Sequence, residues 1–87
     1  MRAFDSRVQD ARRWILNTIK DFFNGAFYAP SEGIAFKILN KEVRPRNTRL
    51  GRGEDRFRVI SKAFLELIDD GLIIYIKDRA TYVMATA

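Results

Sequence analysis

Residues 56–85 read RFRVISKAFLELIDDGLIIYIKDRATYVMA, and this stretch decides the fold. Its first half carries apolar residues at helical spacing and ends on two aspartates and a glycine, as helices commonly do. Two short runs rich in β-branched residues follow, separated by the short polar segment 77–80. The stretch therefore predicts a helix over residues 54–70 and a β-hairpin over residues 72–85.

The predicted helix 54–70 has two different faces when residues are placed at about 100° steps. Its apolar residues, with two from the first strand, form the expected core: Phe57, Ile60, Ala63, Phe64, Leu67, Leu72 and Ile74. Arg58 and Lys62 fall on the opposite side. Arg56 falls toward the apolar side, so we expect its charged end to reach outward along its stem.

Another amphipathic helix is predicted over residues 6–24. Ser6 and Gln9 have the spacing of a capping box, which would satisfy the first backbone donors. Asn24-Gly25 supplies the left-handed conformation that ends many helices. Its expected apolar stripe recurs at steps of three and four residues: Val8, Ala11, Ile15, Ile19 and Phe22.

A second upstream helix is predicted over residues 31–43. Ser31 is its expected N-cap, and Pro45 disfavours helix at the residue before it. Its expected buried face is Ile34, Ala35, Ile38 and Leu39. Residues 26–29 fit a short extended piece, and residues 44–53 have no apolar periodicity, so we expect a loop rich in arginine.

Composition limits the classes of function. The chain of 87 residues fits one domain, residues 1–87. It has no Cys and no His, so we expect no disulfide, no metal, no cofactor and no catalytic activity. No apolar run approaches the roughly 20 residues that span a bilayer. We expect a soluble cytoplasmic protein, associated with the nucleoid if its source is prokaryotic or viral.

The positive charge is concentrated in one segment. Residues 41–62 hold eight basic and three acidic residues, and 8 − 3 = +5 equals the net charge of the whole chain. The remaining residues balance at eight basic and eight acidic. A basic excess confined to one segment is the electrostatic footprint expected for a polyanion.

The block Ser61–Ile73, SKAFLELIDDGLI, resembles the third-helix signature of winged helix-turn-helix proteins. The resemblance implies an α+β, mainly α fold with three helices and a C-terminal β-hairpin wing. It also implies that helix 54–70 is the recognition helix. Here about ten residues separate the second and third helices, whereas the family usually joins them by a few.

The resemblance and the basic segment together predict binding to double-stranded DNA. The protein would be a transcriptional regulator or the DNA-binding domain of a replication or mobile-element protein. The candidate DNA-binding residues are Arg44, Arg46, Arg49, Arg52, Arg56, Arg58, Lys62, Lys77 and Arg79. The arginines of the loop would bind phosphates, and Arg58 and Lys62 would enter the major groove. For each of these basic groups, an ordinary solvated surface is the alternative interpretation.

Two other binding roles are open at this point. Winged-helix domains also act as protein–protein interaction modules, and an RNA or single-strand binder is a further alternative. Trp14, Phe23 and Tyr28 could form a homodimer surface, although packing in the core is the commoner use of such residues.

Overall fold

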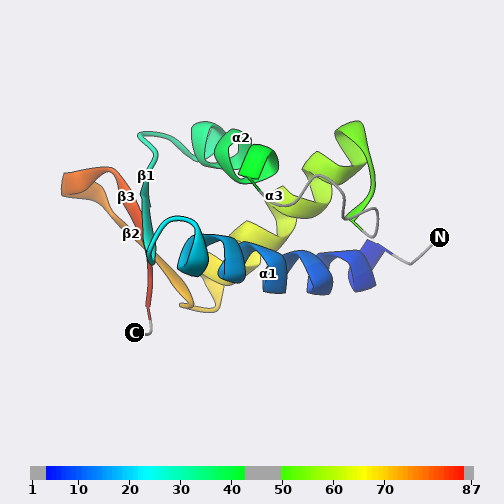
Figure 1. Cartoon of the computed structure of the whole chain (residues 1–87), viewed down its shortest axis with the longest axis horizontal. Helices are drawn as coiled ribbons and strands as arrows, with labels where there is room; N and C mark the ends of the chain where they lie inside the picture. Colours follow the sequence, from blue (N-terminus) through cyan, green and yellow to red (C-terminus); the bar gives the residue numbers. More distant parts are fainter. Residues whose placement is uncertain (1–3, 43–49, 86–87) are drawn as a thin grey trace.

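The computed structural model describes residues 4–42 and 50–85 (Figure 1). Its elements, in chain order, are α1 (Phe4–Asp21), β1 (Ala26–Tyr28), α2 (Glu32–Glu42), α3 (Gly53–Asp69), β2 (Ile73–Ile76), the 3₁₀ turn η2 (Lys77–Arg79) and β3 (Thr81–Met84). The predicted fold class, α+β and mainly α with a C-terminal hairpin, is confirmed, and the layout is consistent with a winged helix.

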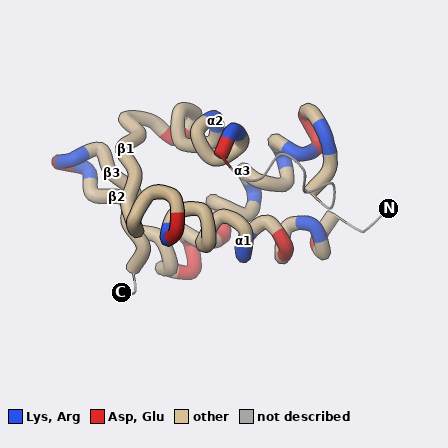
Figure 2. Tube along the Cα trace, viewed as in Figure 1, with Lys and Arg blue, Asp and Glu red and all other residues tan. Residues whose placement is uncertain are grey.

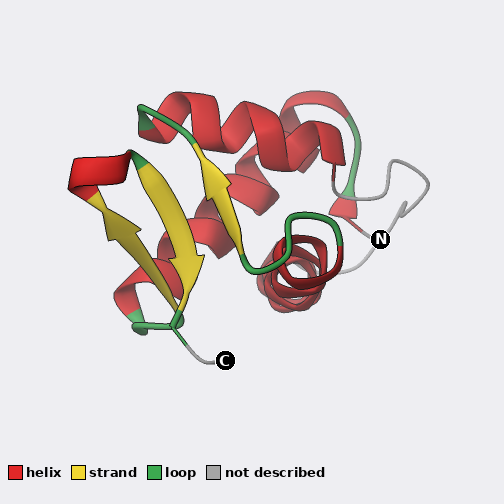
Figure 3. Ribbon diagram, turned by 60° about the vertical axis from the view of Figure 1, so that its left-hand side comes forward, coloured by secondary structure: helices red, strands yellow, loops and turns green. Residues whose placement is uncertain are grey.

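The three strands form one antiparallel sheet in the order β1-β3-β2. None of the three contains a charged residue (Figure 2). The extended piece expected over residues 26–29 is therefore a true strand, which pairs with the second strand of the hairpin. Figure 3 shows the strands side by side, with α3 passing behind them.

Phe64 of α3 occupies the centre of the core. Its side chain is fully buried, and its ring centroid lies 6.2 Å from that of Phe27, 6.0 Å from that of Phe36 and 5.0 Å from that of Tyr82. These three partners come from β1, α2 and β3. Burying one such aromatic side chain contributes roughly 1.5–3 kcal/mol, and here one ring joins four elements.

Local hydrogen bonds explain where two elements begin and end. The predicted N-cap at Ser31 is confirmed, because its Oγ accepts a hydrogen bond from the backbone N–H of Ile34 at 3.2 Å. At the end of α3, Gly71 has a φ of 76°. The N–H of Leu72 then donates to the carbonyl of Leu67 at 2.9 Å, which is the Schellman arrangement.

The predicted boundaries of the first helix are wrong at both ends. The described helix includes Phe4, so Ser6 lies inside it and is no N-cap. It ends at Asp21, because the chain turns through Asn24 and Gly25 at positive φ to enter β1. Phe22 therefore lies beyond the helix and is 64% exposed, where we expected it in the buried stripe.

Two residues expected in the core are exposed, and one unexpected residue is buried. Ile74 is 48% exposed because β2 turns alternate side chains to opposite faces and buries Ile73 instead. Ile34 is 41% exposed because α2 packs mainly on α3 and buries only a narrow stripe, Ala35 and Leu39. Leu50, predicted to lie in a loop, is fully buried.

Gly51 sits at a place that no other residue fits without strain. Its φ is 92°, a backbone conformation that residues other than glycine rarely adopt. A Cβ atom there would lie 2.7 Å from the Oδ2 atom of Asp55 and 2.9 Å from the Nη1 atom of Arg7. The chain can therefore pass this close to Asp55 and Arg7 only because glycine has no side chain.

We expect Gly51→Ala to lower the free energy of unfolding by about 1–3 kcal/mol, because it combines a strained φ with a steric clash. Gly33→Ala is the matched control, because a Cβ at position 33 in α2 meets nothing within 4 Å. That change should be neutral or stabilising by up to about 1 kcal/mol. Urea unfolding of both variants checks this. Equal stabilities would contradict it.

Candidate nucleic-acid interface

The outward face of α3 carries both of the cations predicted for it. Arg58 and Lys62 are exposed, on the side away from the buried residues of the helix. Acidic and apolar residues share this face. Its exposed residues are Glu54, Arg58, Lys62, Leu65 and Asp69. The face therefore has a mixed charge, and its basic part is limited to a single turn.

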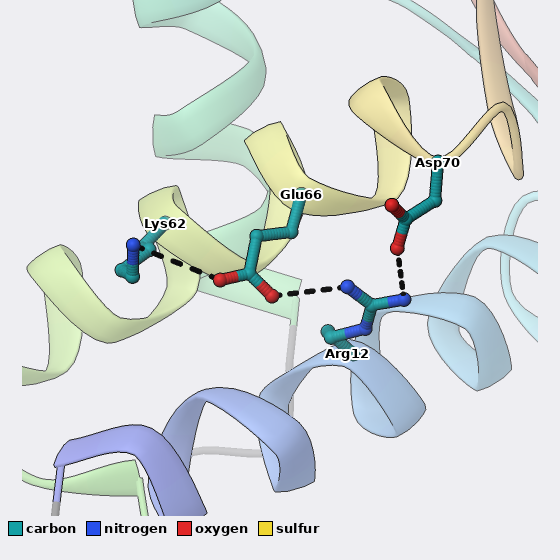
Figure 4. Close-up of polar contacts among 4 residues, drawn as sticks. All are labelled: Arg12, Lys62, Glu66 and Asp70. Carbon is teal, nitrogen blue, oxygen red and sulfur yellow. Dashed lines mark hydrogen bonds and ion pairs between the residues drawn. The ribbon is translucent and has the colours of Figure 1, made fainter.

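Lys62 belongs to a network of ion pairs that joins α3 to α1 (Figure 4). Its Nζ atom lies 3.7 Å from the Oε2 atom of Glu66. The guanidinium group of Arg12 in α1 donates to the Oε1 atom of Glu66 at 2.9 Å and to the Oδ2 atom of Asp70 at 2.6 Å. Glu66 of α3 and Asp70 at its C-cap thus hold one arginine of α1.

The two carboxylates also stabilise the charged form of Arg12. The hydrogen bonds that Arg12 donates to Asp70 and then to Glu66 raise the pKa of Arg12 above its ordinary value. Its positive charge is therefore present at every physiological pH. The charge of Arg12 is neutralised by carboxylates of the same chain, and Glu66 also offsets part of the charge of Lys62.

Arg7 forms a second contact between α1 and α3. Only 7% of the residue is exposed, and its guanidinium group donates to the carboxylate of Asp55 in the first turn of α3. The ring of Phe4 lies 5.9 Å from its Cζ atom, within the range of a cation–π contact. The carboxylate of Asp55 is therefore bound to α1.

The expectation that Arg56 reaches outward is wrong. The residue is only 8% exposed, and its Nη2 atom lies 3.5 Å from the backbone oxygen of Asn40 in α2. Burial lowers the pKa of Arg56 because the charged form loses solvation. Arg56 is buried because it lies on the apolar side of the helix, so it is a poor candidate for contact with DNA.

The remaining candidates of the basic segment divide into two groups. Arg52 is exposed immediately before α3, and neither Arg52 nor Arg58 forms an ion pair with the part of the chain that the structure describes. Arg44, Arg46 and Arg49 lie outside the described residues.

Those three arginines matter for the charge balance. The described residues hold twelve basic and eleven acidic residues, which is a net charge of 12 − 11 = +1. Arg44, Arg46 and Arg49, together with Arg2, account for the other four positive charges of the chain. The described surface by itself is therefore close to neutral.

Lys77 and Arg79 are exposed in η2, at the tip of the hairpin. Charged segments mark this tip and the first turns of α3 at the two ends of the long axis (Figure 2). The molecule is 40 Å long on that axis and 21 Å on the others. The wing tip and the start of α3 therefore do not form one continuous basic patch.

Sequence reasoning missed the Arg12 network. Asp69-Asp70 read only as a helix end. The four-residue spacing of Glu66 and Asp70 is a visible signal for two carboxylates on one side of a helix. Nothing in the sequence shows that Arg12 lies opposite them.

Neither a metal site nor a membrane span is found among the described residues. No group of three or more His, Cys, Asp or Glu residues in ranges 4–42 and 50–85 could hold a metal ion. No helix in the same ranges is long and apolar enough to cross a membrane. Trp14 and Phe23, candidates for a dimer surface, are half-buried against the core, whereas Tyr28 is 65% exposed.

Comparison with known proteins does not assign the chain to a family: no protein-family model, no curated protein and no solved structure matches it.

We expect Arg12→Ala to lower the free energy of unfolding by about 1 kcal/mol, since it removes both partly exposed ion pairs between α1 and α3. Arg13→Ala, the matched control, changes an exposed neighbour in the same helix and should shift stability by less than about 0.5 kcal/mol. Urea unfolding measures both. A loss no larger for Arg12 than for Arg13 would show that the network contributes nothing.

Proposed function

We propose that this chain is a winged helix-turn-helix domain that binds double-stranded DNA, with α3 as its recognition helix. One observation carries the proposal: Arg58 and Lys62 are exposed together on the outer face of a helix that is followed by a β-hairpin. In winged-helix and related domains this helix enters the major groove, where arginine and lysine contact base edges and phosphates.

The basic segment before α3 would supply most of the affinity. Arg44, Arg46 and Arg49 precede Arg52 in the chain by only a few residues, and Arg52 is exposed at the start of α3. Phosphate contacts of this kind are independent of sequence and weaken steeply with salt. Lys77 and Arg79 at the wing tip would add backbone contacts. The long axis of 40 Å is comparable with a DNA helical turn of about 34 Å.

The proposed role is binding and not catalysis. A transcriptional regulator, or the DNA-binding domain of a replication or mobile-element protein, would use a domain of this size and charge. The location that we propose is the cytoplasm, in association with DNA.

A protein–protein interaction module is the second candidate, and the mixed charge of α3 favours it. Glu54 and Asp69 are exposed on the face that carries Arg58 and Lys62, and Leu65 between them is 38% exposed. Phosphates repel acidic side chains, so Glu54 and Asp69 reduce the fit of this face to the DNA backbone. A protein partner accepts both signs of charge.

The double variant Arg58→Glu, Lys62→Glu separates the two candidates. A DNA-binding domain should lose at least about a hundredfold in affinity for duplex DNA, because two phosphate or base contacts become repulsions. Fluorescence anisotropy with a labelled duplex, titrated at several salt concentrations, measures it. Replacing both residues with alanine should reduce the salt slope by roughly 2, one unit for each lost contact.

The control keeps the change in net charge and moves it elsewhere. Lys20→Glu, Lys37→Glu places the same four-unit change on exposed positions of α1 and α2. It should weaken binding far less than the α3 variant. Equal losses would mean that α3 is no specific contact surface, and an unchanged protein that binds no duplex at low salt would end the DNA proposal.

A further inference from the structure

The strand β2 forms an open edge of the sheet with no charged residue. It pairs with β3 alone among the described residues, and its sequence is Ile73-Ile74-Tyr75-Ile76. Soluble proteins usually protect such an edge with lysine, proline or a bulge. The register of β2 with β3 runs through all four residues without a bulge. This strand is therefore an unprotected template for another strand.

The backbone groups that face this open edge follow from the hydrogen bonds of the sheet. The N–H of Ala85 donates to the carbonyl of Leu72, and the N–H of Met84 donates to the carbonyl of Gly25. Odd-numbered residues of β3 therefore bond to β2. In an antiparallel pair the bonded residues alternate, so Ile74 bonds to β3 while Ile73 and Tyr75 turn their N–H and C=O groups outward.

The outer surface of the sheet continues the apolar edge. Side chains of cross-strand partners share a face, and the row Ala26, Val83 and Ile74 lies on the side opposite the buried residues Phe27 and Tyr82. Ile74 is the most exposed side chain of β2, at 48%. A partner strand at the edge would cover it.

The charges at the two ends of β2 indicate which strand fits. Before β2 come Asp69 and Asp70, and after it comes η2 with Lys77 and Arg79 around Asp78. Because Asp70 is paired with Arg12, the first end keeps the −1 of Asp69, and the second end carries 2 − 1 = +1. An antiparallel copy of β2 places the basic end of each strand beside the acidic end of the other. The charges at the ends of β2 therefore complement those of a second, antiparallel copy of the same strand.

We propose that two copies of this chain associate by antiparallel pairing of β2 with β2. The twofold axis passes beside Ile74, so that Ile73 of one copy lies opposite Tyr75 of the other. The twofold axis creates two such pairs, and each exchanges two backbone hydrogen bonds, which makes four across the seam. The two Ile74 side chains pack on each other. The result is one continuous six-stranded sheet with the interface of a C2 dimer.

The dimer is independent of the proposed DNA binding. Its seam uses the edge of the sheet, whereas Arg58 and Lys62 lie on α3. A four-residue seam buries less than the roughly 1,200–2,000 Å² of a standard interface. We therefore expect a weak dimer.

Cysteine cross-linking tests the register directly, because the chain has no cysteine of its own. In the proposed pairing the two Ile74 residues form a non-hydrogen-bonded pair, with Cα atoms about 4.5 Å apart. This lies inside the range in which a disulfide closes. Under mild oxidation without DNA, Ile74→Cys should form a covalent dimer of twice 10.1 kDa in most of the protein.

Ile76→Cys is the matched control on the same strand and the same face. The pairing places Ile76 opposite Leu72 of the other copy, so the two Ile76 residues are about 13 Å apart along the strands and out of disulfide range. It should cross-link at least tenfold more slowly than Ile74→Cys. Equal rates for the two variants would overturn the register.

Sedimentation equilibrium of the unmodified chain provides the second measurement. The mass should rise from 10.1 kDa toward twice that value with concentration, and Ile74→Lys should abolish the rise. Phe22→Lys, at a more exposed apolar residue away from the seam, should leave it unchanged. A monomer at about 1 mM, with the edge free for a strand of another protein, would overturn the proposal. DNA titrations are not involved in either result.

Discussion

The ring of Phe64 is the contact on which the rest of this fold depends. It brings β1, α2 and β3 onto α3 through Phe27, Phe36 and Tyr82. These contacts join segments that are far apart in the chain, so the helices and the hairpin gain a common core only when the ring is buried. The same burial raises the pKa of Tyr82, since its charged form would lose solvation beside Phe64 and would also lie near Glu32.

Several charged side chains of this molecule form ion pairs within the fold. Arg7 of α1 binds Asp55 in the first turn of α3. Arg12 of α1 binds Glu66 of α3 and Asp70 at the C-cap of that helix. The described surface is nearly neutral because Arg2, Arg44, Arg46 and Arg49 lie outside the described residues. The described helices present mixed charges, and the strands present none.

This difference separates the two proposed binding surfaces. The outer face of α3 is the surface proposed for DNA, and its exposed Arg58 and Lys62 are the basis of that proposal. The uncharged edge of β2 suits a strand, and its charged ends fit a second copy. The two surfaces lie on different elements, so each can be disrupted by substitutions that leave the other intact.

Short-range patterns in the sequence determined the elements of this protein. The periodicity around Phe64, the glycine at position 71 and the β-branched runs predicted a helix and a hairpin, because these signals act between neighbours in the chain. Ser31 as a helix cap is local in the same way. They also placed Arg58 and Lys62 outside, since a helix face follows from spacing alone.

Tertiary structure decided everything that depends on distant partners. It buried Arg56 and Leu50, exposed Ile74 and Phe22, and set Arg12 against Glu66, because neighbouring elements determine which side of a helix or strand meets solvent. The spacing of residues along the chain holds no information on which surface lies opposite. For that reason the elements could be predicted from sequence, whereas the ion pairs and the open edge of β2 required the assembled fold.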